Sequence, residues 1–282
     1  MPGLRELSGK VAVVTGGGSG IGGGLCRRFA HNEMSVIVSD IDLPSAERTA
    51  ADLRDDGAQA VAVACDVSNL SEVETLASAT LDAFGRVDVV CNNAGIFLGG
   101  NIREFTEGDW NWTLAVNVMG VVHGSTVFTP YLAQQGSGHI VNTASIGGFS
   151  SDPNCAPYTT SKYAVVGYSE ALRRDLAADN IGVSMLCPGP VATGIDRCDR
   201  LRPASAGESK ATSKAAVPIM EIGMHPDEVG DLVVRGIGDD APYIFTHPEL
   251  GALFEARFAA IRDGLEYAPT PRDGAMDPSA LA

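Results

Sequence analysis

Short apolar runs rich in valine and isoleucine alternate with helix-like segments along most of this chain of 282 residues. We predict strands at 11–15, 35–39, 60–64, 87–91, 139–143, 183–187 and 243–245. Helices are predicted at 21–30, 44–55, 71–84, 110–133, 158–178 and 226–236. Strands that are apolar on both faces and alternate with helices are typical of a parallel sheet covered on both sides. The pattern therefore predicts an α/β fold built on a doubly wound parallel sheet.

The composition is compatible with one large domain. The chain is 45% hydrophobic and only 6% aromatic, with 33 glycines, which suits helices packed closely on parallel strands. We predict a single Rossmann-type domain over 1–282. The segment 197–224 is rich in Ser, Ala, Lys and Pro and lacks a strand pattern, so it is interpreted as a substrate lid. Residues 270–282 are expected to form a flexible tail.

Charge and cysteine usage limit the classes of partner and the compartment. The formal net charge is −15, which argues against nucleic acid and anionic membranes as partners. None of the six cysteines forms a CxxC pair, and no apolar signal core or membrane-spanning run is seen. We expect reduced cysteines and a cytoplasmic protein. The five histidines share no metal-ligand spacing, so no metal is expected.

A glycine-rich loop follows the first predicted strand directly. Residues 15–22 read Thr-Gly-Gly-Gly-Ser-Gly-Ile-Gly, with the spacing G-x-x-x-G-x-G instead of the commoner G-x-G-x-x-G. Glycines permit a tight turn and close backbone approach, while the following helix N-terminus directs free N–H groups at a pyrophosphate. Many glycine loops are only turns, but the position after the first strand favours a dinucleotide site.

Asp40 ends the second predicted strand, about 20 residues beyond the loop, where an acid is expected to accept hydrogen bonds from the ribose hydroxyls of NAD. The alternative is an acid at the start of the next helix. No Arg or Lys lies within the loop or directly after Asp40, so nothing there would bind a 2′-phosphate. The sequence therefore predicts NAD, and not NADP, as the preferred cofactor.

Polar clusters follow the next two strands. Asp66 and Val67 come after the third strand, and Asn92-Asn93-Ala94-Gly95 comes after the fourth. Ligands in open α/β sheets bind outside the carboxyl ends of the strands, so both clusters are candidates for the same site. Taken alone, either cluster could be ordinary turn chemistry.

Tyr158 and Lys162 form an i, i+4 pair on one predicted helix. A phenol with a pKa of about 10 is a poor base at neutral pH, and a neighbouring cation lowers that pKa. Ser145, at the end of the fifth predicted strand, can bring a hydroxyl to the same substrate oxygen. The pair alone could also be two unrelated residues of an ordinary helix.

Together these residues resemble the short-chain dehydrogenases/reductases over about residues 8–250. The resemblance rests on motifs that occur in the family's order: TGGGSGIG at 15–22, Asp66-Val67, NNAG at 92–95, Asn117, Ser145, Tyr158 with Lys162, and Pro188-Gly189. Gly23 and Gly24, directly after the loop, depart from the helix formers usual in the family, and the sequence gives no reason for them.

The resemblance implies a role for each matching residue. Tyr158 would be the acid/base, Ser145 would polarise the substrate oxygen, and Asn117 with Lys162 would relay protons. Lys162 would also bind the nicotinamide ribose and lower the tyrosine pKa. The implied cofactor-binding residues are Gly16, Ser19, Gly20, Ile21, Gly22, Asp40, Asp66, Val67, Asn93, Ala94, Gly95, Tyr158, Lys162, Val191 and Thr193.

The resulting hypothesis is an NAD-dependent oxidoreductase that interconverts a secondary alcohol and a ketone. Apolar residues expected around Tyr158 favour a hydrophobic small molecule, because burying an unpaired charge is unfavourable. These residues are Ile96, Phe97, Leu98, Ile146, Gly147, Gly148, Phe149, Pro190, Val191, Val217, Ile219, Met220 and Ile222. A catalytically silent NAD-binding regulator and a sugar epimerase or dehydratase remain alternatives. The resemblance also implies a homotetramer or homodimer, with the apolar helices at 110–133 and 158–178 between subunits.

Overall fold

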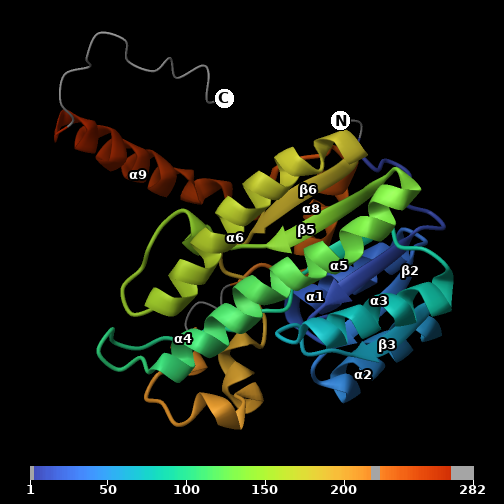
Figure 1. Cartoon of the computed structure of the whole chain (residues 1–282), viewed down its shortest axis with the longest axis horizontal. Helices are drawn as coiled ribbons and strands as arrows, with labels where there is room; N and C mark the ends of the chain where they lie inside the picture. The colour runs from blue at the N-terminus through green and yellow to red at the C-terminus, as the bar shows by residue number, and fades with distance from the viewer. Residues whose placement is uncertain (1–2, 217–222, 268–282) are drawn as a thin grey trace.

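The computed structural model describes residues 3–216 and 223–267, and its centre is a seven-stranded parallel sheet (Figure 1). The strands are β1 Val11–Thr15, β2 Ser35–Asp40, β3 Ala60–Ala64, β4 Val89–Asn92, β5 Gly138–Thr143, β6 Ile181–Cys187 and β7 Tyr243–Phe245. Their order is β3-β2-β1-β4-β5-β6-β7, which confirms the doubly wound, Rossmann-type prediction. The direction of winding reverses between β1 and β4, the point at which such sheets bind ligands.

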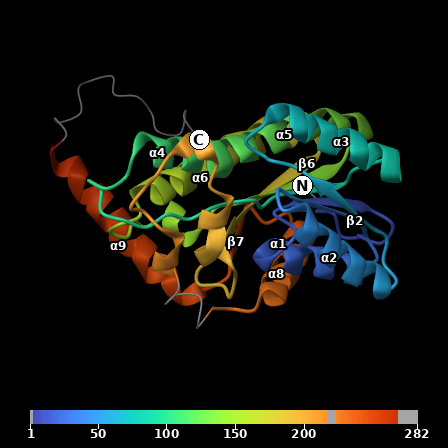
Figure 2. The same ribbon diagram turned by 90° about the horizontal axis from the view of Figure 1, so that it is seen from below.

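Helices cover both faces of the sheet, as Figure 2 shows from below. One layer contains α1 Gly20–His31, α2 Leu43–Asp55 and α8 Pro226–Gly238, and the other contains α3 Leu70–Phe84, α5 Gly120–Gln135 and α6 Ala156–Asp175. Neighbouring residues of β1 show why its sequence is apolar throughout. Val13 packs in one core and Val14 in the other, and both are fully buried.

The helix predicted at 110–133 is three consecutive helical segments. The first is α4, Glu107–Leu114, which begins at a capping box between Thr106 and Asp109. A π-helical turn, Ala115–Met119, joins it to α5. The expectation of one regular α-helix is therefore wrong, because the hydrogen bonds change from α-helical to π-helical and back, although the chain is helical throughout.

A helix that the sequence did not predict follows the last strand. Helix α9, Gly251–Asp263, extends away from the sheet (Figure 1). Its Phe254 ring packs against Phe149 and Phe245, with ring centroids 5.2 Å and 5.1 Å apart. These contacts fix the first turn of α9 beside the edge strand β7. No helix within the described ranges is long and apolar enough to cross a membrane.

In its described part, the segment predicted as a lid includes most of one 3-10 helix, Ile195–Leu201, and two shorter ones, Ala204–Ala206 and Ser213–Ala216. Its predicted apolar residues Val217, Ile219, Met220 and Ile222, like the tail 270–282, lie outside the described residues.

The two glycines that follow the nucleotide loop have different surroundings. A Cβ on Gly24 would overlap the backbone carbonyl of Pro226, so Gly24 allows α1 and α8 to meet closely. Gly230 makes the same approach from α8, because a Cβ there would lie 2.9 Å from the Gly24 carbonyl oxygen. A Cβ on Gly23 would make only ordinary contacts, the nearest at 3.4 Å from Arg27. Helix packing thus explains Gly24 but not Gly23.

Candidate active site

A cavity of about 850 Å³ opens at the carboxyl ends of the strands. It brings together most of the residues selected from the sequence. The predicted residues that line it are Gly16, Ser19, Gly20, Ile21, Asp40, Asp66, Val67, Asn93, Ala94, Gly95, Ser145, Tyr158, Lys162, Val191 and Thr193. Gly22 and Asn117 do not line the cavity, but both contact residues close to it.

The glycine loop has the backbone conformation that its sequence requires. Gly16 and Gly20 have φ values of +66° and +52°, which L side chains rarely adopt. A Cβ on Gly22 would overlap the carbonyl oxygen of Gly16, so Gly22 serves the close packing of the loop on α1. This is the division of roles expected of glycines in a phosphate-binding turn.

Asp40 lies beside this loop at the end of β2. Its two carboxylate oxygens accept hydrogen bonds at 3.0 Å from the backbone N–H groups of Gly18 and Asp42. Burial raises the pKa of Asp40, and these hydrogen bonds offset part of the rise. Arg200, from the segment after β6, forms an ion pair with Asp42 at 2.7 Å. A cation therefore lies near Asp40, although none is adjacent in sequence.

Thr15 is a structural part of the site that the sequence analysis did not select. Its hydroxyl accepts hydrogen bonds from the backbone N–H groups of Asn93 and Ala94, at 3.0 Å and 3.1 Å. The Asn93 side chain donates to the Thr15 carbonyl and accepts from Thr143. These bonds join the ends of β1, β4 and β5, which fixes the floor of the cavity. Thr15 lay within the loop motif, but only the fold reveals its partners.

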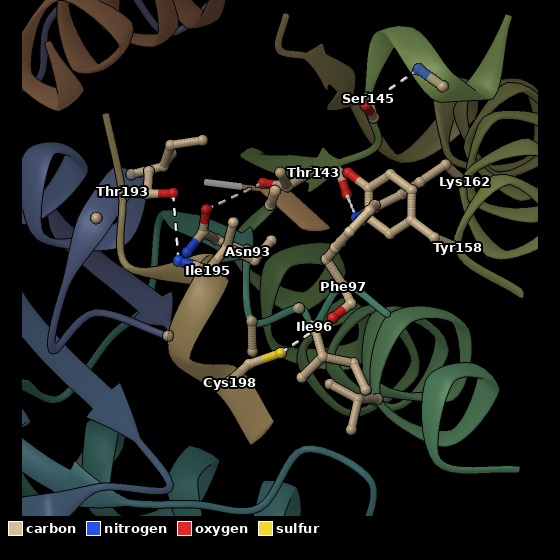
Figure 3. A pocket seen from close by; sticks show the side chains of 18 of the residues that line it. Asn93, Ile96, Phe97, Thr143, Ser145, Tyr158, Lys162, Thr193, Ile195 and Cys198 are labelled. Carbon is tan, nitrogen blue, oxygen red and sulfur yellow. Dashed lines mark hydrogen bonds between the residues drawn. The ribbon is translucent and has the colours of Figure 1, made fainter. Parts of the chain in front are cut away.

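Ser145 and Tyr158 lie on opposite sides of one corner of the cavity (Figure 3). The Ser145 hydroxyl accepts from the backbone N–H of Gly147 at 3.1 Å and donates to the Pro188 carbonyl at 3.4 Å. Burial raises the pKa of Tyr158, and the neighbouring Ser145 hydroxyl offsets part of that rise. The Phe97 ring meets the Tyr158 ring edge to face, with centroids 5.0 Å apart.

Lys162 is buried beside Tyr158, one turn further along α6. Its Nζ donates to the Thr143 carbonyl at 2.9 Å and lies 5.6 Å from the centre of the Tyr158 ring. Burial lowers the pKa of Lys162 to about 8. Burial is the largest influence on the pKa of Tyr158 and raises it, and Lys162 is not among the groups that offset this rise.

Asn117 occupies the π-helical turn and is fully buried. Its side chain accepts from the Ile96 N–H at 2.8 Å and donates to the Ile96 carbonyl and to Ser161, both at 3.0 Å. These three bonds connect the loop after β4 to α6, which carries Tyr158 and Lys162. The side chain of Asn117 therefore positions the site, and π-helical turns are frequent at functional sites.

The rest of the cavity is formed by apolar residues with a few charged groups. Ile96, Phe97, Ile146, Gly147, Pro190 and Val191 line it as expected. Leu98 and Phe149 do not, because Leu98 packs in a separate small core and Phe149 packs against α9. Gly148 is buried against α6. Residues not selected from the sequence also line it, among them Trp112, Cys155, Arg197, Cys198, Arg200, Leu201, Ala206, Leu250 and Leu253.

Comparison with known proteins identifies the family. The family model described as short chain dehydrogenase matches residues 10–202, and the chain belongs to this family. It is 33% identical over 271 residues to a "CLA biosynthesis dehydrogenase/reductase" of Lactiplantibacillus plantarum, covering 92% of this chain and 95% of that protein. It is 29% identical to a "C alpha-dehydrogenase" of Sphingobium, covering 96% of this chain and 92% of the relative.

A solved structure agrees with this assignment. A short-chain dehydrogenase/reductase from Burkholderia phymatum, in complex with NAD, has a TM-score of 0.89 and 38% identity. The match covers 95% of this chain and 98% of that one. The protein is an NAD-type oxidoreductase with a Rossmann-type fold.

The residues of this chain fit that cofactor. The loop from Gly16 to Gly20 offers backbone to a pyrophosphate without side-chain obstruction, and Asp40 presents a carboxylate where the adenosine ribose would lie. Lys162 and Tyr158 mark the other end of the same cavity. Among the described residues, no group of three or more His, Cys, Asp or Glu side chains is placed to hold a metal ion.

Proposed function

We propose that this protein interconverts a secondary alcohol and a ketone, with Tyr158 as acid/base and Ser145 polarising the substrate oxygen. The observation that carries the proposal is the convergence of Ser145, Tyr158 and Lys162 in one corner of the cavity that contains the glycine loop. Two hydroxyls at one point can both contact a single substrate oxygen, which is what general acid–base catalysis on an alcohol requires.

The chemistry follows from the positions of these groups. The nicotinamide, when bound, supplies or accepts the hydride. In the direction of oxidation, Tyr158 must first release its own proton, and as the phenolate it takes the alcohol proton while the Ser145 hydroxyl stabilises the charge on the substrate oxygen. In reduction, Tyr158 gives its proton to the carbonyl oxygen. The raised pKa of Tyr158 supports this second role, because it keeps the phenol protonated at neutral pH.

Lys162 is suited to carry protons to and from Tyr158. Its pKa of about 8 lies close to neutral pH, so both its charged and neutral forms are accessible there. We propose that Lys162 relays protons, and that Asn117 supports the relay by fixing the π-helical turn beside it. The bonds of Asn117 to Ile96 and Ser161 support this assignment.

The apolar lining supports a hydrophobic substrate. Phe97, Trp112 and Leu253 face the cavity from three different parts of the chain. Arg200 and Arg197, which also line it, have carboxylate partners in Asp42 and Asp196. We infer that a neutral, bulky alcohol or ketone binds better than a carboxylated or phosphorylated one. Clearly better turnover of the charged compounds under saturating NAD would contradict this inference.

An activity assay with a panel of secondary alcohols tests the proposal. Formation of NADH, followed by absorbance, is expected with the unaltered protein. Tyr158→Phe should lose several orders of magnitude in turnover and still bind NADH, because only the phenol oxygen is removed. Comparable turnover in this variant would exclude Tyr158 as the acid/base.

The same assay separates the alternatives. A silent regulator would bind NADH and oxidise nothing, whereas an epimerase would convert sugars without net NADH formation. The complete set of Ser145, Tyr158, Lys162 and Asn117 favours the dehydrogenase, since a pure binder needs no acid/base group. We also propose a cytoplasmic location, and the six cysteines support it because each is a buried free thiol.

A further inference from the structure

A buried ion pair joins two parts of the cavity wall that are far apart in the sequence. Asp109 lies in the first turn of α4 and Arg202 follows β6, and their carboxylate and guanidinium groups meet at 2.8 Å. The Asp109 side chain is fully buried and that of Arg202 is 16% exposed. None of the roles derived above for proton transfer or nucleotide binding uses this pair.

The pair is the centre of a larger network. Arg202 donates from Nε to the Gly207 carbonyl and from a terminal nitrogen to the Ala206 carbonyl. Asp109 also accepts from the Ser209 hydroxyl at 2.7 Å. Burial alone would raise the pKa of Asp109, but its hydrogen bonds with Thr106, Ser209 and Arg202 outweigh burial and lower it. The carboxylate is therefore ionised and fully partnered.

Both ends of the network line the cavity. From α4 come Gly108, Asn111 and Trp112, and the Arg202 guanidinium lies 5.4 Å from the Trp112 ring. A Cβ on Gly108 would overlap the Ala206 carbonyl, so the two segments meet backbone to backbone. From the other segment come Cys198, Leu201, Pro203, Ser205 and Ala206.

The wall also continues to the reacting corner. The Cys198 thiol donates to the Phe97 carbonyl at 3.2 Å, and the Phe97 ring packs on Tyr158 (Figure 3). Asp199 accepts from Thr212 and Ser213, which fixes the far end of the same segment. The segment 198–213 is thus attached to α4, to the loop after β4 and to itself.

We propose that Asp109 and Arg202 are positioning residues that set the width of the substrate end of the cavity, and thereby select for the bulk of the alcohol. This inference rests on the proposed function. The three donor nitrogens of the Arg202 guanidinium form a rigid planar fork, and each nitrogen has its own acceptor. Such a buried fork fixes the distance between α4 and the segment 198–213 more strictly than apolar packing would. Loss of the fork should let α4 and the segment 198–213 separate, with Trp112 moving away from the substrate.

The test compares substrate selection in Arg202→Met with that in Arg173→Met. Arg173 is a matched control: it pairs with the buried Asp240 at 2.8 Å and also donates to two backbone carbonyls, but it does not line the cavity. Both variants should lose thermal stability because each removes a guanidinium that pairs with a buried carboxylate. If the methionine variant does not fold, Arg202→Lys is used instead. It keeps the positive charge but lacks the planar guanidinium, so it tests whether the geometry of the donors matters.

The readout is the ratio of kcat/KM for diphenylmethanol to that for isopropanol. In Arg202→Met this ratio should change by about tenfold or more, chiefly through KM for the bulky alcohol. In Arg173→Met it should stay unchanged, and Arg202→Lys should lie between. The dissociation constant of NADH should change much less than this ratio in all three, because none of the hydrogen bonds of Asp109 or Arg202 reaches the glycine loop or Asp40.

A second measurement does not depend on turnover. The chain has two tryptophans, so Trp110→Phe leaves Trp112 as the single reporter in the wall. Trp112 is 7% exposed, and its emission should shift to longer wavelength when Arg202→Met is added. An unchanged emission, or equal effects on both alcohols, would overturn the inference and leave the proposed function standing. Failure of the unaltered protein to oxidise any secondary alcohol would overturn both.

Discussion

At the scale of single residues, Lys162 destabilises the fold that contains it. Its pKa falls from an ordinary 10.5 to about 8 on burial, so the unfolded chain binds a proton that the folded chain has lost between these values. Stability therefore rises with pH over this range as far as Lys162 is concerned. Below the folded pKa the charged amine remains buried, and its full penalty applies.

Replacing Lys162 should reveal this penalty. We expect Lys162→Met to be more stable than the unaltered protein by about 3 kcal/mol near pH 7, an estimate obtained from the lowered pKa. The difference should shrink toward zero as the pH approaches about 10, where the unfolded lysine also loses its proton. Urea denaturation of both proteins at the two pH values measures it. A gap that does not narrow with pH would argue against burial as the source.

Asp40 is expected to decide between NAD and NADP. A 2′-phosphate beside this carboxylate would meet like charge, and removing the carboxylate would expose the phosphate to Arg200 instead. Asp40→Ala should lower the ratio of kcat/KM for NAD to that for NADP by about tenfold. Asp40→Asn distinguishes the effect of the charge from that of the hydrogen bonds. The asparagine is neutral, but its side-chain oxygen can still accept one of the two hydrogen bonds from Gly18 and Asp42. If the ratio of kcat/KM for NAD to that for NADP is unaltered in both variants, Asp40 does not distinguish the ribose hydroxyl from the 2′-phosphate.

The contacts of individual residues were less predictable than their identities. Asp40, Tyr158 and Lys162 could be selected from the sequence because each follows a strand end or shares a helix face. Thr15 and Arg202 could not, because their partners Asn93 and Asp109 lie 78 and 93 residues away. The direction of the Tyr158 pKa was also unpredictable, since the burial that raises it depends on the complete cavity.

At the scale of elements, the contact between α1 and α8 depends on small residues. Gly24 and Gly230 allow the backbones to approach, whereas a Cβ on Gly23 would make only ordinary van der Waals contacts. Gly24→Ala should lower the free energy of unfolding by about 1–3 kcal/mol, because the helices must separate. Gly23→Ala should raise it by about 0.5–1 kcal/mol through helix propensity alone. Chemical denaturation of the two variants gives the comparison, and effects of the same sign would contradict this account.

Strands were easier to predict than the segments around the cavity. Both β1 and β3 have the expected bounds, because turn residues flank short apolar runs. The π-helical turn at Ala115–Met119 does not disturb the apolar pattern, so periodicity could not reveal it. Helix α9 could not be predicted because none of its residues is buried, and burial of one face is the cause of the periodic apolar pattern.

At the scale of the whole molecule, the apolar sequence that motivated the expected subunit contact has a second explanation. The helices over 110–133 and 158–178 are apolar in sequence, but their large side chains, such as Phe128, Leu132 and Val165, fill the core of the chain itself. Within α4 to α6, the large apolar side chain that remains exposed is Met119, at 43%. Exposed apolar residues gather instead on and after α9, at Leu253, Phe258, Ile261 and Leu265.

We therefore expect a homodimer or homotetramer in which α9 packs against a second copy of the chain. Phe258, which is 58% exposed, and Ile261 lie about one turn apart, and burying both between subunits would stabilise an assembly. Light scattering after size-exclusion chromatography should give at least twice the chain mass at micromolar concentration. The double variant Phe258→Glu/Ile261→Glu should reduce that mass, whereas Leu70→Glu, at an exposed apolar site on α3, should not. A reduction by Met119→Glu alone would place the contact on the helices originally expected, and a monomeric unaltered protein would refute the assembly altogether.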